Sequence, residues 1–337
     1  MQTFRRFFIT LILVGIVTLP AVVVIDFFWK QRDLSTDFLM EGFNSKPLDV
    51  LYFGDSTIRF YGERDVNRAG IDEFFREWSG LSVLTVANPG YSAILYSQYV
   101  RLLAKTRYKP KLVVIPVNLR GFSDSASKRP SVSFPLRQIY IKFRADGVLE
   151  WFKYLQYRFL GLEDRQNDEW NNKPVIHGSV NLGTNRQILD SSRINDFIDY
   201  APEREPRYAR QLSIKFRYHY MMDVGPNDPV LRHLDDTIGY LKKLGIPVIV
   251  YLTPINVQDG QRYAGTDFTD QVTRNFAVIR QRIESNGVTV LDLSCSLDPS
   301  NFIHKQDVFE HLNYNGRQFV AQQVAKTALE LLQKEHK

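Results

Sequence analysis

Residues 51–60 read LYFGDSTIRF, and they join a run typical of a buried strand to a polar turn. Val50 to Phe53 are apolar or aromatic throughout, as in a strand covered on both faces of a sheet. Gly54 then permits a sharp turn that presents Asp55 and Ser56. A serine at such a strand end is often no more than a helix cap, so Ser56 alone assigns no function.

Apolar runs and amphipathic stretches alternate along most of the chain, which favours a sheet with helices on both faces. Five short β-branched runs predict strands: Leu48–Gly54, Leu81–Asn88, Lys111–Asn118, Ile246–Pro254 and Val288–Ser294. Five amphipathic stretches predict helices: Asp65–Trp78, Ser92–Arg107, Pro229–Leu244, Phe268–Asn286 and Asn315–Gln333. We therefore predict an α/β fold, a three-layer sandwich around a mostly parallel five-stranded sheet.

The segment 122–227 interrupts this alternation and predicts a large insertion. It is polar, rich in aromatic residues and poorly periodic, and so long a segment is usually functional or has structure of its own. One interpretation is a lid or substrate groove; the other is a helical cap that covers the sheet. Four of its residues recur at helical spacing and are the candidate substrate-binding residues: Trp151, Tyr154, Tyr157 and Arg158. The alternative is that these four pack onto the sheet or onto a membrane surface.

The N-terminus predicts a membrane anchor. Residues 7–25 form nineteen positions without a charge, and Phe27, Phe28 and Trp29 extend the run to residues 7–29. No small-residue cleavage site follows, which favours a retained anchor over a cleaved signal peptide. We predict an anchor over residues 1–32 and a domain over residues 33–337, with a single pass through the inner (cytoplasmic) membrane. A weak charge asymmetry places the domain on the extracytoplasmic, periplasmic side.

Composition excludes several classes of function. The net charge of +6 and the pI near 9.2 are mildly basic, but Lys and Arg are scattered, so we expect no nucleic-acid partner. An anionic envelope polymer or a lipid surface fits this charge as well. The single cysteine, Cys295, excludes an intrachain disulfide and a cysteine-based metal cluster. The histidines lack the spacing of metal ligands, so no metal and no cofactor is expected.

Three further stretches change the interpretation of Ser56. ANPGYS places Gly90 after the second predicted strand, and IPVNLRGFS places Asn118 after the third. DVFEHLNYNG places His311 just before the last helix. This ordered set, Ser56, Gly90, Asn118 and His311, resembles the SGNH (GDSL-type) hydrolase family over about residues 48–332, without the insertion.

The resemblance implies a flavodoxin-like SGNH fold and a role for each of these residues. Ser56 would be the nucleophile and His311 the base that takes its proton. The oxyanion hole would consist of the backbone N–H groups of Ser56 and Gly90 and the side-chain amide of Asn118.

The sequence departs from the family at the acid that orients the base. The family has an aspartate three residues before the histidine, where this chain has Val308. Asp307 lies four residues before His311 and is the favoured catalytic acid, because residues i and i+4 of a helical turn are neighbours. A Ser–His dyad oriented by a backbone carbonyl is the alternative. His304 is a rival base, and Glu310 directly precedes His311.

The expected function is a membrane-anchored serine esterase or O-acyltransferase of SGNH type. Its substrate would be acyl esters, acetyl-like in size, of an extracytoplasmic polysaccharide. Anchored proteins of this kind resemble components of cell-envelope polysaccharide acylation, similar to the D-alanyl transfer protein of teichoic-acid modification. A multi-span membrane O-acyltransferase is the partner that this implies. The alternatives are a lipid esterase or thioesterase, and a catalytically silent SGNH fold that binds glycan or scaffolds a membrane enzyme.

Overall fold

The structure, a computed structural model, describes residues 33–62, 65–122, 135–147, 219–303 and 310–335, together with residues 149 and 152. The predicted anchor over residues 1–32 and most of the predicted insertion lie outside these ranges. No helix among the described residues is both long and apolar enough to span a bilayer. The anchor therefore stays a prediction from the sequence.

The centre of the molecule is a five-stranded sheet in the order β2-β1-β3-β4-β5, with every neighbouring pair parallel. Its strands are β1 (Val50–Gly54), β2 (Val83–Ala87), β3 (Leu112–Val117), β4 (Val248–Leu252) and β5 (Thr289–Asp292). Each falls within one of the five apolar runs, so the predicted α/β fold with a parallel five-stranded sheet is confirmed.

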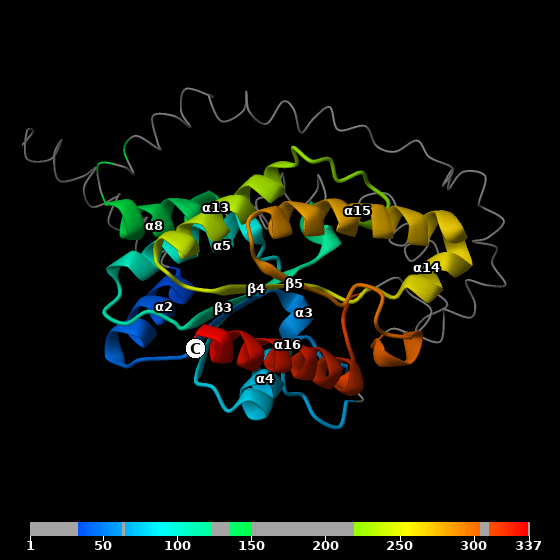
Figure 1. The fold of residues 1–337 in the computed structure, drawn as a ribbon, viewed down its shortest axis with the longest axis horizontal. Helices are drawn as coiled ribbons and strands as arrows, with labels where there is room; N and C mark the ends of the chain where they lie inside the picture. The colour runs from blue at the N-terminus through cyan, green and yellow to red at the C-terminus, as the bar shows by residue number, and fades with distance from the viewer. Residues whose placement is uncertain are drawn as a thin grey trace, which may run out of the picture.

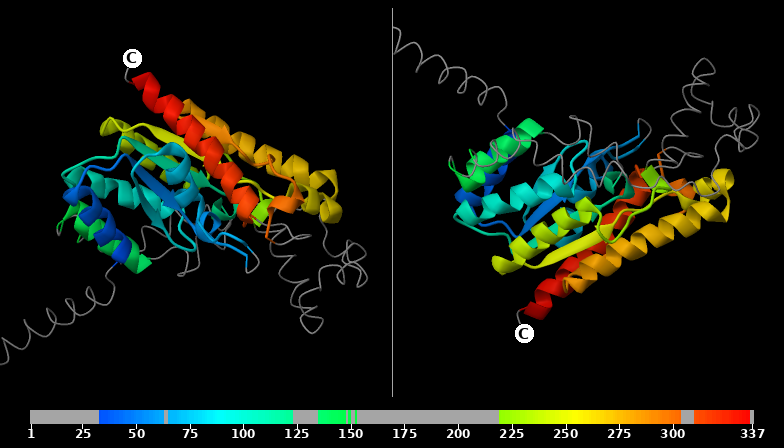
Figure 2. Two further views of the ribbon diagram at one scale, coloured as in Figure 1. Left: turned by 90° about the horizontal axis from the view of Figure 1, so that it is seen from below. Right: turned by 90° about the horizontal axis from the view of Figure 1, so that it is seen from above.

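Helices cover both faces of the sheet and complete the three layers (Figure 1). One face packs against α2 (Leu34–Ser45), α5 (Ala93–Leu102), α8 (Pro135–Asp146), α13 (Pro229–Lys243) and α15 (Thr266–Ser285). The other packs against α4 (Ile71–Ser79) and α16 (Tyr314–Glu335). Figure 2 shows the two faces: in the left panel, seen from below, α16 lies in front of the sheet. In the right panel, seen from above, α13 and α15 lie in front of it.

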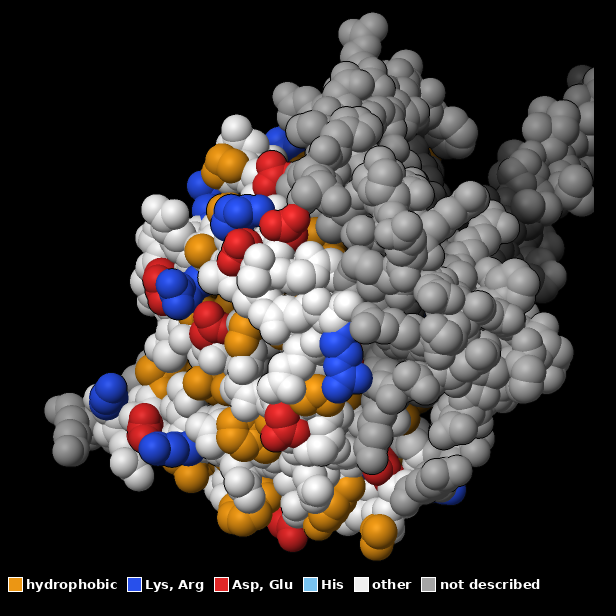
Figure 3. Space-filling view, turned by 90° about the vertical axis from the view of Figure 1, so that its right-hand side faces the viewer, with side chains coloured by type: hydrophobic (Ala, Val, Ile, Leu, Met, Phe, Trp, Pro, Cys, Tyr) orange, Lys and Arg blue, Asp and Glu red, His pale blue; other side chains and the backbone are white. Residues whose placement is uncertain are grey.

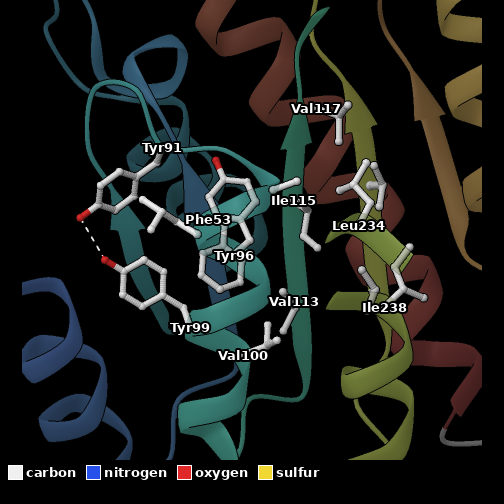
Figure 4. Close-up of a cluster of buried hydrophobic side chains, with 14 of the residues drawn as sticks. Phe53, Tyr91, Tyr96, Tyr99, Val100, Val113, Ile115, Val117, Leu234 and Ile238 are labelled. Atoms are coloured by element: carbon white, nitrogen blue, oxygen red, sulfur yellow. Dashed lines mark hydrogen bonds between the residues drawn. The ribbon is translucent and has the colours of Figure 1, made fainter. Parts of the chain in front are cut away.

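Successive residues of β1 divide between the two apolar cores, because side chains alternate along a strand. Leu51 and Phe53 belong to the core under α5 and α13, and Val50 and Tyr52 to the core under α4 and α16. Figure 4 shows the first core, where Phe53 stacks on Tyr96 with ring centroids 4.8 Å apart. Burial on both faces explains why the sequences of β1, β3 and β4 are almost continuously apolar.

One predicted helix begins later than expected, and the structure contains helices that the sequence did not predict. Residues 65–70 of the predicted helix Asp65–Trp78 are not helical; α4 begins at Ile71 because Glu73 accepts the backbone N–H of Gly70 and caps the first turn. Two helices were not predicted, α2 and α14 (Val257–Ala264), and α8 lies within the predicted insertion. The short helices are α3 (Ser56–Arg59) and the 3-10 turns η1 (Leu103–Lys105), η2 (Leu119–Phe122) and η6 (Pro299–Asn301).

Polar contacts join α8 to α2, the first described helix after the predicted anchor. Arg137 pairs with the buried Asp33 at 3.2 Å, and Arg144 pairs with Asp37 at 3.3 Å. The helix α8, which belongs to the predicted insertion, is therefore fastened to α2.

Figure 3 shows the face on which α14 lies at the right of Figure 1. On the described part of this face, acidic and basic side chains are interspersed, and the lower half of the view shows hydrophobic side chains among them. Interspersed charges partly cancel, so they create a weaker long-range field than charges of one sign.

Candidate active site

The candidate site lies at the carboxyl ends of β1 and β3. The order of the sheet reverses at β1, because β2 pairs on one side of it and β3 on the other. Open parallel sheets bind ligands at the carboxyl ends of their strands beside such a reversal. Ser56 follows β1 by two residues and Asn118 directly follows β3.

Ser56 is the first residue of α3 and is not its cap. Asp55 caps the helix: its carboxylate accepts the Thr57 N–H at 2.7 Å and the Thr57 hydroxyl at 2.6 Å. The Ser56 hydroxyl instead lies 3.1 Å from Nε2 of His311. The interpretation of Ser56 as a plain helix cap is therefore wrong, and the structure brings the predicted nucleophile and base together.

Gly54 is required by a close contact. A Cβ atom there would lie 2.1 Å from Cδ1 of Ile58, a buried residue of α3. The sequence predicted a glycine for the sake of a sharp turn, but Gly54 is not among the described glycines with positive φ. The side chain of Ile58 thus packs directly on the end of β1, which sets α3 close to the sheet.

His311 is positioned by a short antiparallel bridge and an aromatic ring. The backbone N–H of Ile303 donates to the carbonyl of His311 at 3.1 Å, beside the Phe302–Leu312 bridge. Phe60 stacks on the imidazole, with centroids 4.4 Å apart and planes 15° apart. These contacts limit how the buried His311 ring can move relative to Ser56.

Arg317, which the sequence analysis missed, joins the loop after α3 to the start of α16. Its guanidinium is fully buried and pairs with Asp65 at 2.8 Å. It also donates to the carbonyl oxygens of Phe60, Asn67, Ala69 and Leu312. Burial tends to raise the pKa of Asp65, but hydrogen bonds from Arg317 and two backbone N–H groups lower it below its ordinary value. An arginine after HLNYNG gave no signal in the sequence, because most arginines are exposed.

Asn118 is held at both ends of its side-chain amide. Its Nδ2 donates to Asp55 Oδ2, and its Oδ1 accepts the Gly121 N–H at 2.9 Å. The amide nitrogen carries two hydrogens, so the bond to Asp55 occupies only one of them. The donor predicted for the oxyanion is thus fixed in place by the residue that precedes Ser56.

Gly90 lies in a tight turn after β2. The Tyr91 N–H donates to the Asn88 carbonyl at 3.1 Å, and Gly90 has φ of 82°. Proline second and glycine third is the sequence of a type II turn, which needs positive φ at its third residue. Because Ala87 pairs in register with Gly54, this turn lies at the same edge of the sheet as Ser56.

Glu310 is buried beside His311 and pairs with Arg120 of η2. Burial raises the pKa of the Glu310 carboxyl to about 7, although the charge of Arg120 opposes this and Asp55 adds to it. The sequence alone marks Glu310 only as the residue directly before His311. The structure instead gives it a partner from the loop that follows Asn118.

The remaining predicted residues lie outside the described ranges. They are the catalytic acid Asp307, the rival base His304, and the substrate-binding set Trp151, Tyr154, Tyr157 and Arg158. Their roles stay predictions. Among the described residues, no cluster of three His, Cys, Asp or Glu side chains could hold a metal ion.

No family model matches the sequence, and no curated protein matches it. Several solved structures have some likeness to it. One is a Bacteroides fragilis protein assigned as an acylhydrolase, which is 12% identical in sequence and has a TM-score of 0.43. The match covers 89% of this chain and 99% of that chain. An acetyl-xylooligosaccharide esterase from Geobacillus stearothermophilus has 11% identity, coverage of 83% and 94%, and a TM-score of 0.39. An extracellular lipase from Streptomyces rimosus has 12% identity, coverage of 83% and 99%, and a TM-score of 0.38. At these identities and TM-scores the likeness does not establish an activity for this chain.

Proposed function

We propose that this protein is a serine ester hydrolase of SGNH type, with Ser56 as nucleophile and His311 as base. The observation that carries the proposal is the contact of 3.1 Å between Ser56 Oγ and His311 Nε2 at the carboxyl edge of the sheet. A hydroxyl becomes a useful nucleophile when a base within hydrogen-bond reach accepts its proton. The contact joins residues 255 positions apart, so it exists only in the folded chain.

The reaction proceeds in two steps, acylation of Ser56 and deacylation. Ser56 Oγ gives its proton to His311 Nε2 and attacks the ester carbonyl, forming a tetrahedral oxyanion. The bond to the leaving oxygen then breaks, that oxygen takes the proton from His311, and the acyl group remains on Ser56. A water molecule or another hydroxyl then gives its proton to His311 and attacks the acyl carbon; the bond between that carbon and Ser56 Oγ breaks, and Ser56 Oγ takes the proton back from His311.

The oxyanion is stabilised by donors at the same edge of the sheet. The second N–H of the Asn118 amide is one, and the backbone N–H groups of Ser56 and Gly90 are the others. Donors that are fixed before the reaction stabilise the developing charge without reorganising. The hydrogen bonds from Asn118 to Asp55 and from Gly121 to Asn118 support this role, because they hold the amide rigidly.

We further propose a substrate and a cellular location for the protein. The acceptor is a hydroxyl of an extracytoplasmic polysaccharide, the acyl group is acetyl-like, and the domain is anchored in the inner membrane by residues 7–29. A multi-span membrane O-acyltransferase supplies the acyl group. The uncharged N-terminal run and the resemblance of the ordered Ser, Gly, Asn and His residues support this proposal.

The decisive experiment compares Ser56→Ala with Ser285→Ala in the full-length protein. Ser285 ends α15, and its hydroxyl donates to the Arg282 carbonyl on the molecular surface. We expect Ser56→Ala to abolish hydrolysis of p-nitrophenyl acetate and labelling by a fluorophosphonate, and Ser285→Ala to leave both unchanged. Labelled wild-type protein digested for mass spectrometry should carry the probe on Ser56. Turnover that persists in Ser56→Ala would exclude the serine mechanism.

A second measurement separates transfer from hydrolysis. With p-nitrophenyl acetate as donor, a transferase should move acetyl groups onto an added polysaccharide while hydrolysis to acetate falls. Acetate as the sole acyl product, whatever the glycan, would restrict the proposal to an esterase.

A further inference from the structure

A buried ion pair bridges the two loops that carry Asn118 and His311. Arg120 lies two residues after Asn118 in η2, and Glu310 directly precedes His311. The Glu310 side chain has no exposed surface, and that of Arg120 is 24% exposed. The guanidinium Nε contacts Glu310 Oε2. Two segments that are far apart in sequence are therefore fastened together right beside the candidate catalytic groups.

This pair closes a ring of contacts around the site. Ser56 contacts His311, and the neighbour of Ser56, Asp55, accepts a hydrogen bond from Asn118. From Asn118 the chain runs to Arg120, which pairs with Glu310, and Glu310 leads by one peptide bond back to His311. Three polar contacts and three short chain segments thus form a closed circuit. A displacement at one contact is transmitted to the others, because each connecting segment is only one or two residues long.

We propose that Arg120 and Glu310 are positioning residues that hold His311 at Ser56 in register with the Asn118 amide, and that protonation of Glu310 loosens this arrangement. The proposal rests on the proposed serine hydrolase function. Neither residue touches the reacting atoms in it; both act through the backbone positions of His311 and Asn118. Misplacement of reacting groups by about 1 Å can cost about 10² in rate, so such a clamp can influence turnover strongly.

The groups around Glu310 explain why its protonation matters near neutral pH. Burial raises its pKa to about 7, the negative charge of Asp55 acts in the same direction, and Arg120 and the Leu119 N–H oppose them. Burial works against the charge of Arg120, but Glu310, Tyr220 and Asp55 keep the pKa of the guanidinium above its ordinary value. Arg120 therefore remains charged while Glu310 exchanges its proton. When Glu310 is neutral, the charge attraction across the ring is lost.

The first test is Glu310→Gln in the full-length protein, assayed with p-nitrophenyl acetate. Glutamine keeps the shape of the side chain but cannot carry the charge. We expect kcat to fall at least tenfold at pH 8 with KM within twofold. We also expect the dependence of kcat on pH to lose one ionisation near pH 7. The matched control is Asp259→Asn, which neutralises another buried carboxylate, paired with Arg262 in α14, and should change neither kcat nor the profile.

The second test replaces both partners by apolar residues, Arg120→Met with Glu310→Leu. Exchanging a buried ion pair for apolar side chains is often neutral or stabilising for the fold. We expect the double variant to keep its melting temperature and to lose kcat as Glu310→Gln does. A folded double variant with wild-type kcat would overturn the positioning role. A Glu310→Gln profile with the same ionisations as the wild type would overturn the role of Glu310 protonation.

A third measurement does not depend on catalysis. The folded-state pKa of Glu310 lies above its ordinary value of 4.5, so its stabilising contribution is present below pH 4.5 and is lost as the pH rises to about 7. The melting temperature of the wild type should fall relative to that of Glu310→Gln across this interval. Parallel curves would contradict the proposed titration even if the wild type hydrolysed no ester. If the melting-temperature curves diverged but the wild type showed neither turnover nor labelling, only the proposed function would be rejected.

Discussion

At the scale of single residues, the site depends on two glycines that permit close approach. Gly54 allows Ile58 to pack against the end of β1, which places Ser56. Gly316 lies in the first turn of α16, where a Cβ atom would come within 2.5 Å of the Asn301 carbonyl oxygen. Asn301 also accepts the Asn313 N–H at 3.0 Å, two residues from His311. The contacting atom is a backbone oxygen, so Asn301 cannot make room by rotating a side chain.

We predict that Gly316→Ala lowers the free energy of unfolding by about 1–3 kcal/mol, because overpacking forces the backbone apart. Turnover should fall as well, since the bridge beside His311 must shift. Chemical denaturation and ester hydrolysis measure the two effects. The matched control is Gly239→Ala in α13, where nothing lies within 4 Å of an added Cβ; helix propensity there should stabilise the protein by about 0.5–1 kcal/mol. Equal stability of Gly316→Ala and the wild type would contradict the steric argument.

At the scale of elements, the start of α16 is fastened to the loop between α3 and α4. Asp65 accepts the Tyr314 N–H with one carboxylate oxygen and the Arg317 guanidinium with the other. The same guanidinium reaches the carbonyl of Phe60, whose ring stacks on His311. The loop and the helix thus act as one support for the imidazole.

We predict that Arg317→Met costs about 3–5 kcal/mol of stability, because it leaves Asp65 and several carbonyl groups without their buried partner. The comparison is Arg282→Met, which breaks the more exposed pair with Asp235 and should cost at most about 1 kcal/mol. Denaturant unfolding of both variants tests this ranking. A similar cost for both would show that the buried guanidinium adds nothing specific.

Arg317→Met should also change how the free energy of unfolding depends on pH under acidic conditions. The pKa of Asp65 is lowered in the fold, so its contribution is present above the ordinary value of 3.8 and is lost as the pH falls through and below it. The wild type should therefore lose more stability than Arg317→Met on acidification below about pH 4. If both proteins lost the same stability below about pH 4, the pairing would not lower the pKa of Asp65.

At the scale of the whole molecule, α2 is the described helix nearest to the predicted anchor over residues 1–32. This helix packs in the core under α5, and α8 is fastened to its N-terminal end through Arg137 and Asp33. If residues 7–29 cross the membrane, the domain is held within a few residues of the bilayer. The orientation then decides which substrates the site can meet.

We predict that a reporter active only outside the cytoplasm, fused after Lys337, is active in cells, because the charge asymmetry around residues 7–29 favours an extracytoplasmic domain. The control is the same fusion without residues 1–32, which should be inactive. Activity confined to a cytoplasmic reporter would reject the extracytoplasmic site and favour an esterase acting on inner-leaflet lipids.

Among the described residues, the sequence alone indicated all five strands and the helices α4, α5, α13, α15 and α16. The central strands β1, β3 and β4 are buried on both faces, and this leaves continuous apolar runs; α4, α5, α13, α15 and α16 leave a period of 3.6 residues. The same local signals located Ser56, Gly90, Asn118 and His311 at strand ends or loops. The start of α4 was placed too early, because amphipathic spacing extends through residues that precede the cap at Gly70.

Which of these residues meet, and what holds them in place, follows from the folded structure and not from local sequence. The contact of Ser56 with His311, the burial of Arg317 and the pairing of Arg120 with Glu310 all join segments far apart in the chain. Periodicity reports whether a position is covered, and it carries no information about which distant side chain covers it. A charged residue is also expected at the surface until its partner is known, since burial of a charge is tolerated only when it is paired.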